Sequence, residues 1–161
     1  MATEGLRDLE QDAWRGFLLA HDRLWRALEA GLAPLNVSMA EYSVLSLLYE
    51  AGPDGMRMSD LARRRLMSTG GFTRLADRLQ NRGLIERRRS AADGRGFEAT
   101  LTADGRTLIR RARRQHHNDL RELFFARLDD DHLRCLAEIW DLLAPADESG
   151  PAGEREGRKA R

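Results

Sequence analysis

The sequence has few of the features that place a protein outside the cell or in a membrane. Its 161 residues include a single cysteine, Cys135, so the chain cannot form an internal disulfide, as is usual in a reducing compartment. No apolar run approaches the roughly 18 residues that a membrane-spanning helix needs. The N-terminus also lacks the basic-then-apolar pattern of a secretory signal. These absences predict a cytoplasmic protein without a membrane segment.

Motifs that carry catalysis are missing too. No glycine-rich phosphate loop follows an expected strand, no Gly-x-Ser-x-Gly occurs, and nothing around Cys135 marks it as a nucleophile. We interpret Cys135 as a core residue on the apolar stripe of a helix. The sequence therefore predicts no enzyme and no cofactor.

One group of residues raises the question of a metal site. His116, His117 and His132 flank the run Asp129-Asp130-Asp131. Adjacent histidines point about 100° apart on a helix, so both cannot easily bind one ion, and no cysteine or second histidine stands four residues away. The pattern favours no metal site, and a metal-dependent regulator stays open as an alternative.

The most informative stretch runs from Arg57 to Thr102 and begins with two short helical patterns. Ser59 is an N-cap type of residue, and apolar residues follow it at helical spacing: Leu61, Ala62, Leu66 and Met67. Ser68 and Thr69 offer a second cap, and the next helix has one apolar stripe: Phe72, Leu75, Ala76 and Leu79. Gly83 ends that helix. In such a pair, the second helix lies in the major groove of DNA.

A change from helical spacing to alternation after Gly83 predicts a β-hairpin. One strand opens at Leu84, and a second strand has alternating apolar residues on one face: Phe97, Ala99 and Leu101. The turn between them, residues 90–96, carries an Asp-Gly pair and Arg95. An arginine at the tip of a hairpin suits the narrow, electronegative minor groove. Residues 56–58 could add a short strand beside the hairpin. Together these elements form a winged helix-turn-helix.

Charge is unevenly distributed along the chain, although the whole sequence has a net charge of only +1. Residues 1–56 hold nine acidic and four basic residues, which gives −5. Residues 57–98 hold eleven arginines and five acidic residues, which gives +6, and residues 99–161 hold twelve of each sign. A solvated basic face would look the same, but the positive segment coincides with the winged helix-turn-helix, so we interpret it as a phosphate-binding surface.

The predicted contacts with double-stranded DNA lie at the start of the second helix, in the hairpin and just before the first helix. They are Arg57, Ser68, Thr69, Gly70, Gly71, Thr73, Arg74, Arg78, Arg88 and Arg95.

The same stretch resembles the MarR family of bacterial transcriptional regulators. The resemblance rests on residues 68–79, on Arg82-Gly83-Leu84-Ile85-Glu86-Arg87, on Asp93-x-Arg95 and on Leu101-Thr102-x-x-Gly105, and it covers roughly residues 38–143. It implies a ligand-responsive repressor that binds a pseudo-palindromic operator as a homodimer. In that family the N- and C-terminal helices interlock two subunits.

Apolar stripes at helical spacing flank the DNA-binding stretch on both sides. One long helix is predicted from Glu4 to Ala30, and a capping box, Ser38-x-x-Glu41, opens another. Thr102 caps a long basic helix after the hairpin. The run Asp129-Asp130-Asp131 caps a final helix, whose inward stripe is Leu133, Leu136, Ala137, Trp140 and Leu143.

We therefore predict a mainly α fold with a small β-hairpin wing, in four parts. Residues 4–37 form part of a dimerisation layer, and residues 38–102 form the winged helix-turn-helix DNA-binding domain. Residues 103–144 complete the dimerisation layer, and the charged tail 145–161 is expected to be disordered because it has almost no apolar residues. Large apolar stripes on the end helices predict a homodimer, since a small winged helix cannot cover them.

The resemblance also implies a crevice between the dimerisation layer and the DNA-binding domain that takes a small aromatic or anionic effector. The residues predicted to line it are Trp14, Phe17, His21, Trp25, Tyr42 and Ser46. Two other interpretations stay open here: these side chains could simply pack the core, with His21 as a hydrogen-bonded structural histidine, and the chain could be an architectural protein that binds DNA without sequence preference.

Overall fold

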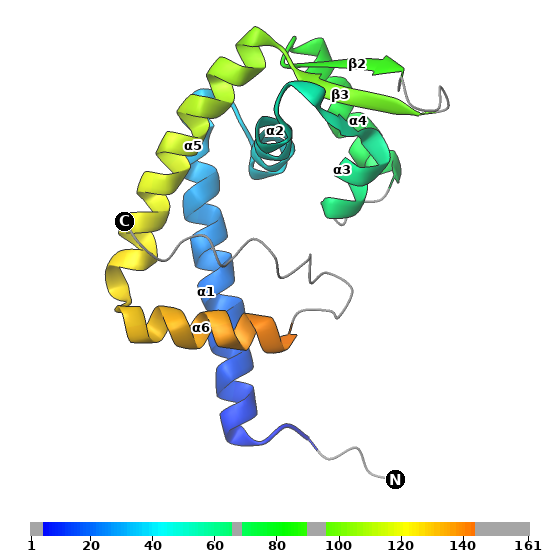
Figure 1. Cartoon of the computed structure of the whole chain (residues 1–161). Coiled ribbons are helices and arrows are strands. Elements are labelled where there is room, and N and C mark those ends of the chain that lie inside the picture. The colour runs from blue at the N-terminus through cyan, green and yellow to red at the C-terminus, as the bar shows by residue number, and fades with distance from the viewer. Residues whose placement is uncertain (1–4, 66–68, 90–95, 144–161) are drawn as a thin grey trace, which may run out of the picture.

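The computed structural model describes residues 5–65, 69–89 and 96–143, and it divides into two parts (Figure 1). A winged-helix lobe contains α2 (Met39–Ala51), α3 (Met58–Arg64), α4 (Thr69–Asn81) and a three-stranded sheet. A helical arm contains α1 (Asp8–Leu32), α5 (Ala103–Leu123) and α6 (Asp130–Leu143). Short 3-10 turns follow α1, α2 and α5, at Ala33–Leu35, Gly52–Asp54 and Phe125–Arg127. The fold is the predicted mainly α winged helix.

The sheet is antiparallel with the order β1-β3-β2. Its strands are β1 (Met56–Arg57), β2 (Ile85–Arg89) and β3 (Phe97–Leu101). Ile85 pairs with Leu101, and Arg89 pairs with Phe97, so β2 and β3 form the predicted hairpin. The predicted short strand at residues 56–58 is confirmed at its first two residues. The strand predicted from the alternation of Phe97, Ala99 and Leu101 is confirmed as β3, in which Ala99 and Leu101 are buried and Phe97 is 52% exposed.

Local capping signals set most of the helix boundaries. In the predicted capping box, the Ser38 amide donates to Glu41 Oε2 (3.0 Å), and the Glu41 amide donates to Ser38 Oγ (3.2 Å). Thr102 Oγ1 accepts from the Gly105 amide at 3.0 Å. Gly83 has φ +67°, and the Leu84 amide donates to the Leu79 carbonyl, which is the Schellman ending that glycine favours. The predicted Ser59 cap was wrong, because α3 already begins at Met58.

One apolar core joins the lobe to the arm. Leu28 and Leu32 at the end of α1 and Ile109 and Ala112 of α5 are buried. They pack in the same cluster as residues of the lobe, and the largest fully buried lobe side chains are Val44, Leu45, Leu48, Leu61, Leu75, Leu79 and Ile85. Because α1 and α5 share this core with α2 and α4, a movement of the arm is transmitted to the helices of the lobe.

The rest of the arm lacks such cover within one chain. The residues predicted to face inward on α6 do not do so: Leu133 and Leu136 are half-buried, while Ala137, Trp140 and Leu143 are exposed. Cys135 is exposed as well, which contradicts its assignment to the core. Exposed apolar side chains continue on α1, where Trp14 is 56% exposed. These apolar faces are uncovered in a single chain, as expected for stripes that a small winged helix cannot cover.

Four predictions fall on residues outside the described ranges. They concern Leu66 and Met67 of the first helix, the cap at Ser68, the turn with Arg95, and the tail from Pro145. No described helix is both long and apolar enough to cross a bilayer.

Candidate nucleic-acid interface

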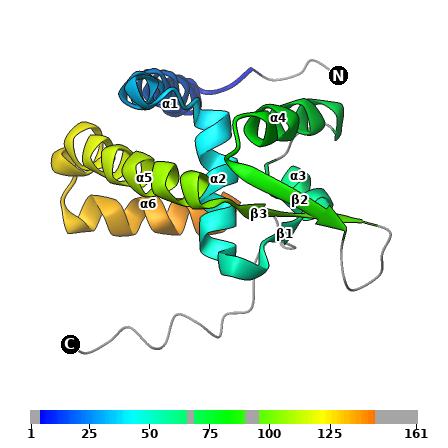
Figure 2. The same cartoon turned by 90° about the horizontal axis from the view of Figure 1, so that it is seen from above.

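Helix α4 presents a polar face to solvent because its apolar stripe is fully used by the core. Phe72, Leu75, Ala76 and Leu79 are at most 3% exposed. The residues between them, Thr73, Arg74, Asp77 and Arg78, are exposed. Helix α3 packs against α4, and both lie on the outer side of the lobe, away from α5 (Figures 1 and 2). This is the arrangement of a helix-turn-helix in which α4 is free to enter a groove of DNA.

An ion pair fixes α4 to the wing. The Arg87 guanidinium of β2 pairs with the Asp77 carboxylate of α4. The Arg87 side chain is only 19% exposed, so this contact is partly screened from water. In the sequence, Arg87 stood out only as part of the motif that carries the resemblance. The two residues lie on different elements, a helix and a strand, so no single period relates them and the pair had no signal in the sequence.

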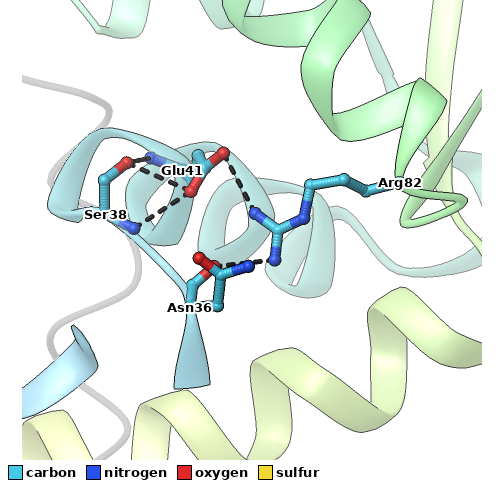
Figure 3. A network of polar contacts seen from close by, with 4 residues as sticks. All are labelled: Asn36, Ser38, Glu41 and Arg82. Carbon is cyan, nitrogen blue, oxygen red and sulfur yellow. Dashed lines mark hydrogen bonds and ion pairs between the residues drawn. The ribbon is translucent and has the colours of Figure 1, made fainter. Parts of the chain in front are cut away.

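A second polar network holds the C-terminal end of α4 against the start of α2 (Figure 3). Arg82 donates from Nη1 to Glu41 Oε1 at 3.1 Å and from Nη2 to the Asn36 carbonyl at 2.7 Å. Asn36 has a left-handed φ of +53°, which turns the chain between α1 and α2. Glu41 is 8% exposed and the only charged residue buried in the described part of the chain.

The same network reaches the arm. Glu29 of α1 accepts a hydrogen bond from the Met39 amide at the start of α2, at 2.8 Å. Arg82, Glu41 and Glu29 therefore link α4, α2 and α1 through a chain of polar contacts. These contacts set where the second helix of the pair stands relative to the arm, and they span too many residues for the sequence to have indicated them.

Two of the predicted DNA contacts meet in one hollow. A depression of about 590 Å³ between α3, α4 and the sheet is lined by Arg57 and Thr73 together with Ser59, Gln80, Arg87 and Phe97. Arg74 and Arg78 lie exposed on the same helix as Thr73. The structure thus brings Arg57, Thr73, Arg74 and Arg78 to one side of the lobe.

The other predicted contacts are placed differently. Arg88 donates to the Pro53 carbonyl at 3.5 Å, and as the strand neighbour of Arg87 it points to the opposite face of the sheet, away from α4. Gly70 is exposed and Gly71 half-buried near the start of α4. Thr69 begins α4, while Ser68 and Arg95 lie outside the described residues.

The six residues predicted to line an effector crevice lie in two places in the single chain. Trp14, Phe17 and His21 line an apolar groove between α1 and α6, and Trp25 stacks on His21 at 5.8 Å. Tyr42 and Ser46 instead face α5. The Tyr42 ring centroid lies 4.4 Å from that of His116, and Ser46 Oγ accepts from Arg113 Nη1 at 2.6 Å.

The two histidines in these places have different surroundings. His21 is exposed and makes ring contacts with Phe17 and Trp25, and no hydrogen bond to its ring is found in the described part of the chain, which contradicts the structural role considered for it. His116 is half-buried, and burial, followed by the nearby charge of His117, lowers its pKa. Burial likewise raises the pKa of the Tyr42 hydroxyl. The two pKa shifts favour the neutral His116 imidazole and the neutral Tyr42 hydroxyl, which lie between α2 and α5.

The residues considered for a metal site do not gather around one point. Over the described ranges, no group of three or more His, Cys, Asp and Glu side chains is placed to hold an ion.

His132 Nδ1 lies 2.6 Å from Asp129 Oδ1, and the same carboxylate accepts a hydrogen bond from the His132 amide at 2.9 Å. Asp129 therefore caps α6, as predicted.

Comparison with known proteins agrees with this geometry. A sequence model described as the MarR family matches residues 35–96. The HTH-type transcriptional repressor Rv2887 of Mycobacterium tuberculosis is 32% identical over 106 residues, which cover 65% of this chain and 75% of that protein. The chain belongs to the MarR family. The resemblance seen in the sequence is confirmed.

Solved structures of MarR family regulators match most of this chain. AbsC of Streptomyces coelicolor, a MarR family transcriptional regulator, is 33% identical with a TM-score of 0.84, over 88% of this chain and 95% of that one. Sco3205 of the same organism, a MarR family regulator solved in complex with DNA, is 27% identical with a TM-score of 0.82, over 89% and 97%. Both alignments extend beyond the winged-helix lobe and include most of the helical arm.

Proposed function

We propose that this MarR family chain is a sequence-specific DNA-binding repressor that acts as a homodimer on a pseudo-palindromic operator. The observation that carries the proposal is the face of α4, where Thr73, Arg74 and Arg78 are exposed while the opposite face is buried. Residues 38–102 bind DNA, and residues 4–37 with 103–144 hold two copies together. The complex of Sco3205 with DNA supports a DNA-binding role for a lobe of this shape. The proposed role is regulation rather than catalysis.

Contacts in the two grooves have different tasks. Residues at the start of α4 contact base edges in the major groove, and Thr73 and Arg74 are the side chains there that are exposed. Arg57 and Arg78 neutralise phosphates beside them. Arg95, in the turn of the wing, reads the shape of the minor groove. Arg88 contributes through its charge alone, because its side chain is directed toward Pro53.

The dimer forms through the apolar groove between α1 and α6. Three aromatic residues are each more than 40% exposed in one chain: Trp14, Phe17 and Trp140. They are nevertheless neighbours, because the ring centroid of Phe17 lies 5.9 Å from that of Trp140 and 5.7 Å from that of Trp14. Contiguous apolar surface of this extent usually marks an interface. A two-fold dimer places two copies of α4 in successive major grooves, about 10 bp apart.

A small aromatic or anionic effector would act by favouring a dimer whose α4 helices are wrongly spaced for DNA. Typical coupling between effector and DNA sites is about 1 to 3 kcal/mol. The core shared by α1, α2, α4 and α5 provides the mechanical connection. The six aromatic and polar residues named from the sequence lie in two places, and we assign the effector to neither place.

Arg74→Ala is expected to weaken binding to the operator by on the order of 1 to 3 kcal/mol, because it removes a base or phosphate contact at the start of α4. Fluorescence anisotropy with an operator duplex and with a random duplex, at fixed salt, measures the effect. The loss of affinity should be larger on the operator, because a random duplex offers the phosphate contacts but not the matching bases.

The matched control is Arg26→Ala, which removes an exposed arginine from α1, where it pairs with Asp22. It should leave both affinities nearly unchanged. Wild-type operator affinity in Arg74→Ala would exclude α4 as the reading helix. Equal affinity of the wild type for operator and random duplex would instead indicate an architectural DNA-binding protein.

A further inference from the structure

A basic hollow lies along α5, outside both the DNA-binding face and the α1–α6 groove. Its volume is about 420 Å³, and its lining includes Arg110, Arg113, Arg114, His117 and Arg121 of α5 with Tyr49 of α2. The α5 residues recur at intervals of three and four and so share one face of the helix. No acidic side chain lines this hollow.

The basic hollow is separate from the parts of the molecule already assigned. The side of α5 that packs in the core carries the buried residues Ile109 and Ala112, and Arg113 is the arginine of the hollow that hydrogen-bonds to α2. The helix runs from the sheet away from α3 and α4, as both views show (Figures 1 and 2). Its positive charge is therefore not part of the surface that α4 presents to DNA.

Most of the charge in the basic hollow is not neutralised by the protein. Arg113 pairs with Glu50 at 2.7 Å and lies over the Tyr49 ring, 5.3 Å from its centroid. Within the described ranges, no carboxylate pairs with Arg110, Arg114 or Arg121, although Arg121 reaches the Asn118 amide oxygen at 3.4 Å. Like charges at these helical spacings repel one another. An anion with several charges would relieve this repulsion.

We propose that the basic hollow binds a small molecule carrying a chain of phosphate groups. The planar guanidinium group presents paired donors that match the oxygens of a phosphate group. Successive arginines on a helix face have Cβ atoms about 5 to 6 Å apart, so a chain of phosphates reaches several of them, whereas a single phosphate reaches fewer. This proposal requires neither operator binding nor the aromatic groove.

Arg113 connects the basic hollow to the winged-helix lobe. Its guanidinium binds both Glu50 and Ser46 of α2. A phosphate chain in the hollow therefore competes with the Glu50 carboxylate for the same guanidinium. Removing the Glu50 charge should tighten binding, whereas removing arginines should weaken it, so the two changes have opposite signs.

The test is isothermal titration of the full chain, without DNA, with inorganic tripolyphosphate at low ionic strength. We expect saturable binding of one tripolyphosphate per chain. The double variant Arg110→Ala/Arg114→Ala should weaken it by about 10-fold or more, because it removes two charge-assisted contacts. Glu50→Gln should strengthen it. The control Arg111→Ala removes an exposed arginine of α5 that does not line the hollow, and should change affinity by less than about twofold.

Three results would overturn the proposal. The first is the absence of saturable binding to the wild type. The second is an equal loss in Arg111→Ala and in the double variant, which would mean that only the overall charge of α5 attracts the anion. The third is a matching loss of random-duplex affinity in the double variant, which would make the hollow a nucleic-acid surface. Thermal melting of each variant verifies that it is folded, and none of these outcomes depends on the α4 face.

Discussion

Trp140→Glu is expected to convert the protein from a dimer to a monomer and to weaken operator binding by roughly 10² to 10⁴-fold, the factor that simultaneous engagement of two sites typically contributes. Trp140 is 46% exposed and contacts Phe17 across the α1–α6 groove. A carboxylate in the middle of an interface made of such side chains would be buried without a partner, which is strongly unfavourable. In the monomer the indole site is open to water, so the variant should still fold.

Analytical ultracentrifugation at micromolar concentration and operator titration measure the two effects. The matched control is Arg134→Glu, which introduces the same carboxylate on the polar side of α6, where Arg134 is exposed and pairs with Asp131. The control should remain dimeric and bind the operator with little change. A dimeric Trp140→Glu variant would show that the α1–α6 groove is not the interface.

Arg82→Ala is expected to lower the free energy of unfolding by on the order of 2 to 3 kcal/mol. The change leaves the Glu41 carboxylate and the Asn36 carbonyl without the guanidinium that both now bind. Removing one partner of a fully buried pair typically costs about 3 to 5 kcal/mol. We expect less here, because Arg82 is 29% exposed and Glu41 keeps its hydrogen bonds to Ser38.

Urea denaturation followed by circular dichroism measures this loss. Arg63→Ala is the control, since it breaks an exposed pair with Asp60 on α3 and should cost well under about 1 kcal/mol. Arg82→Lys should give an intermediate loss, because an ammonium group cannot reproduce the fork that binds Glu41 and Asn36 together. Equal stabilities of Arg82→Ala and Arg63→Ala would mean that the network in Figure 3 does not hold α4 in place.

Features that depend on a few neighbouring residues could be predicted from the sequence. Ser38 and Glu41 cap α2, Thr102 caps α5, and Gly83 ends the helix before the wing, because each of these signals acts within one helical turn. The buried stripe of α4 also followed from spacing alone. These local rules were enough to predict a winged helix, while the family, and with it the general role, came from the resemblance carried by motifs such as Asp93-x-Arg95 and Leu101-Thr102-x-x-Gly105.

Contacts between distant segments could not be predicted in the same way. Glu41 and Arg82 are separated by 41 positions, and the two ends of the network meet only because α2 and α4 share a core. The stripe of α6 is a related case: it indicates which side of the helix avoids water, and the size of the stripes on the end helices predicted that a second copy covers them. Trp140 and Leu143 belong to such a stripe and are exposed in one chain.

Residue type alone did not show where the predicted effector residues lie relative to one another. Trp14 and Phe17 lie on the half of α1 that faces α6, whereas Tyr42 and Ser46 of α2 face α5. The effector site stays a prediction. Arg88 is similar, since alternation along β2 directs it away from α4 although its neighbour Arg87 reaches Asp77.

Two copies of this chain are proposed to read one DNA sequence through their α4 helices. Selection of bound fragments from the source genome, followed by sequencing, tests this proposal most directly. We expect an enriched pseudo-palindrome with half-site centres about 10 bp apart, protected by two chains. Recovery of fragments without a common sequence, or of a site that a single chain occupies, would contradict it.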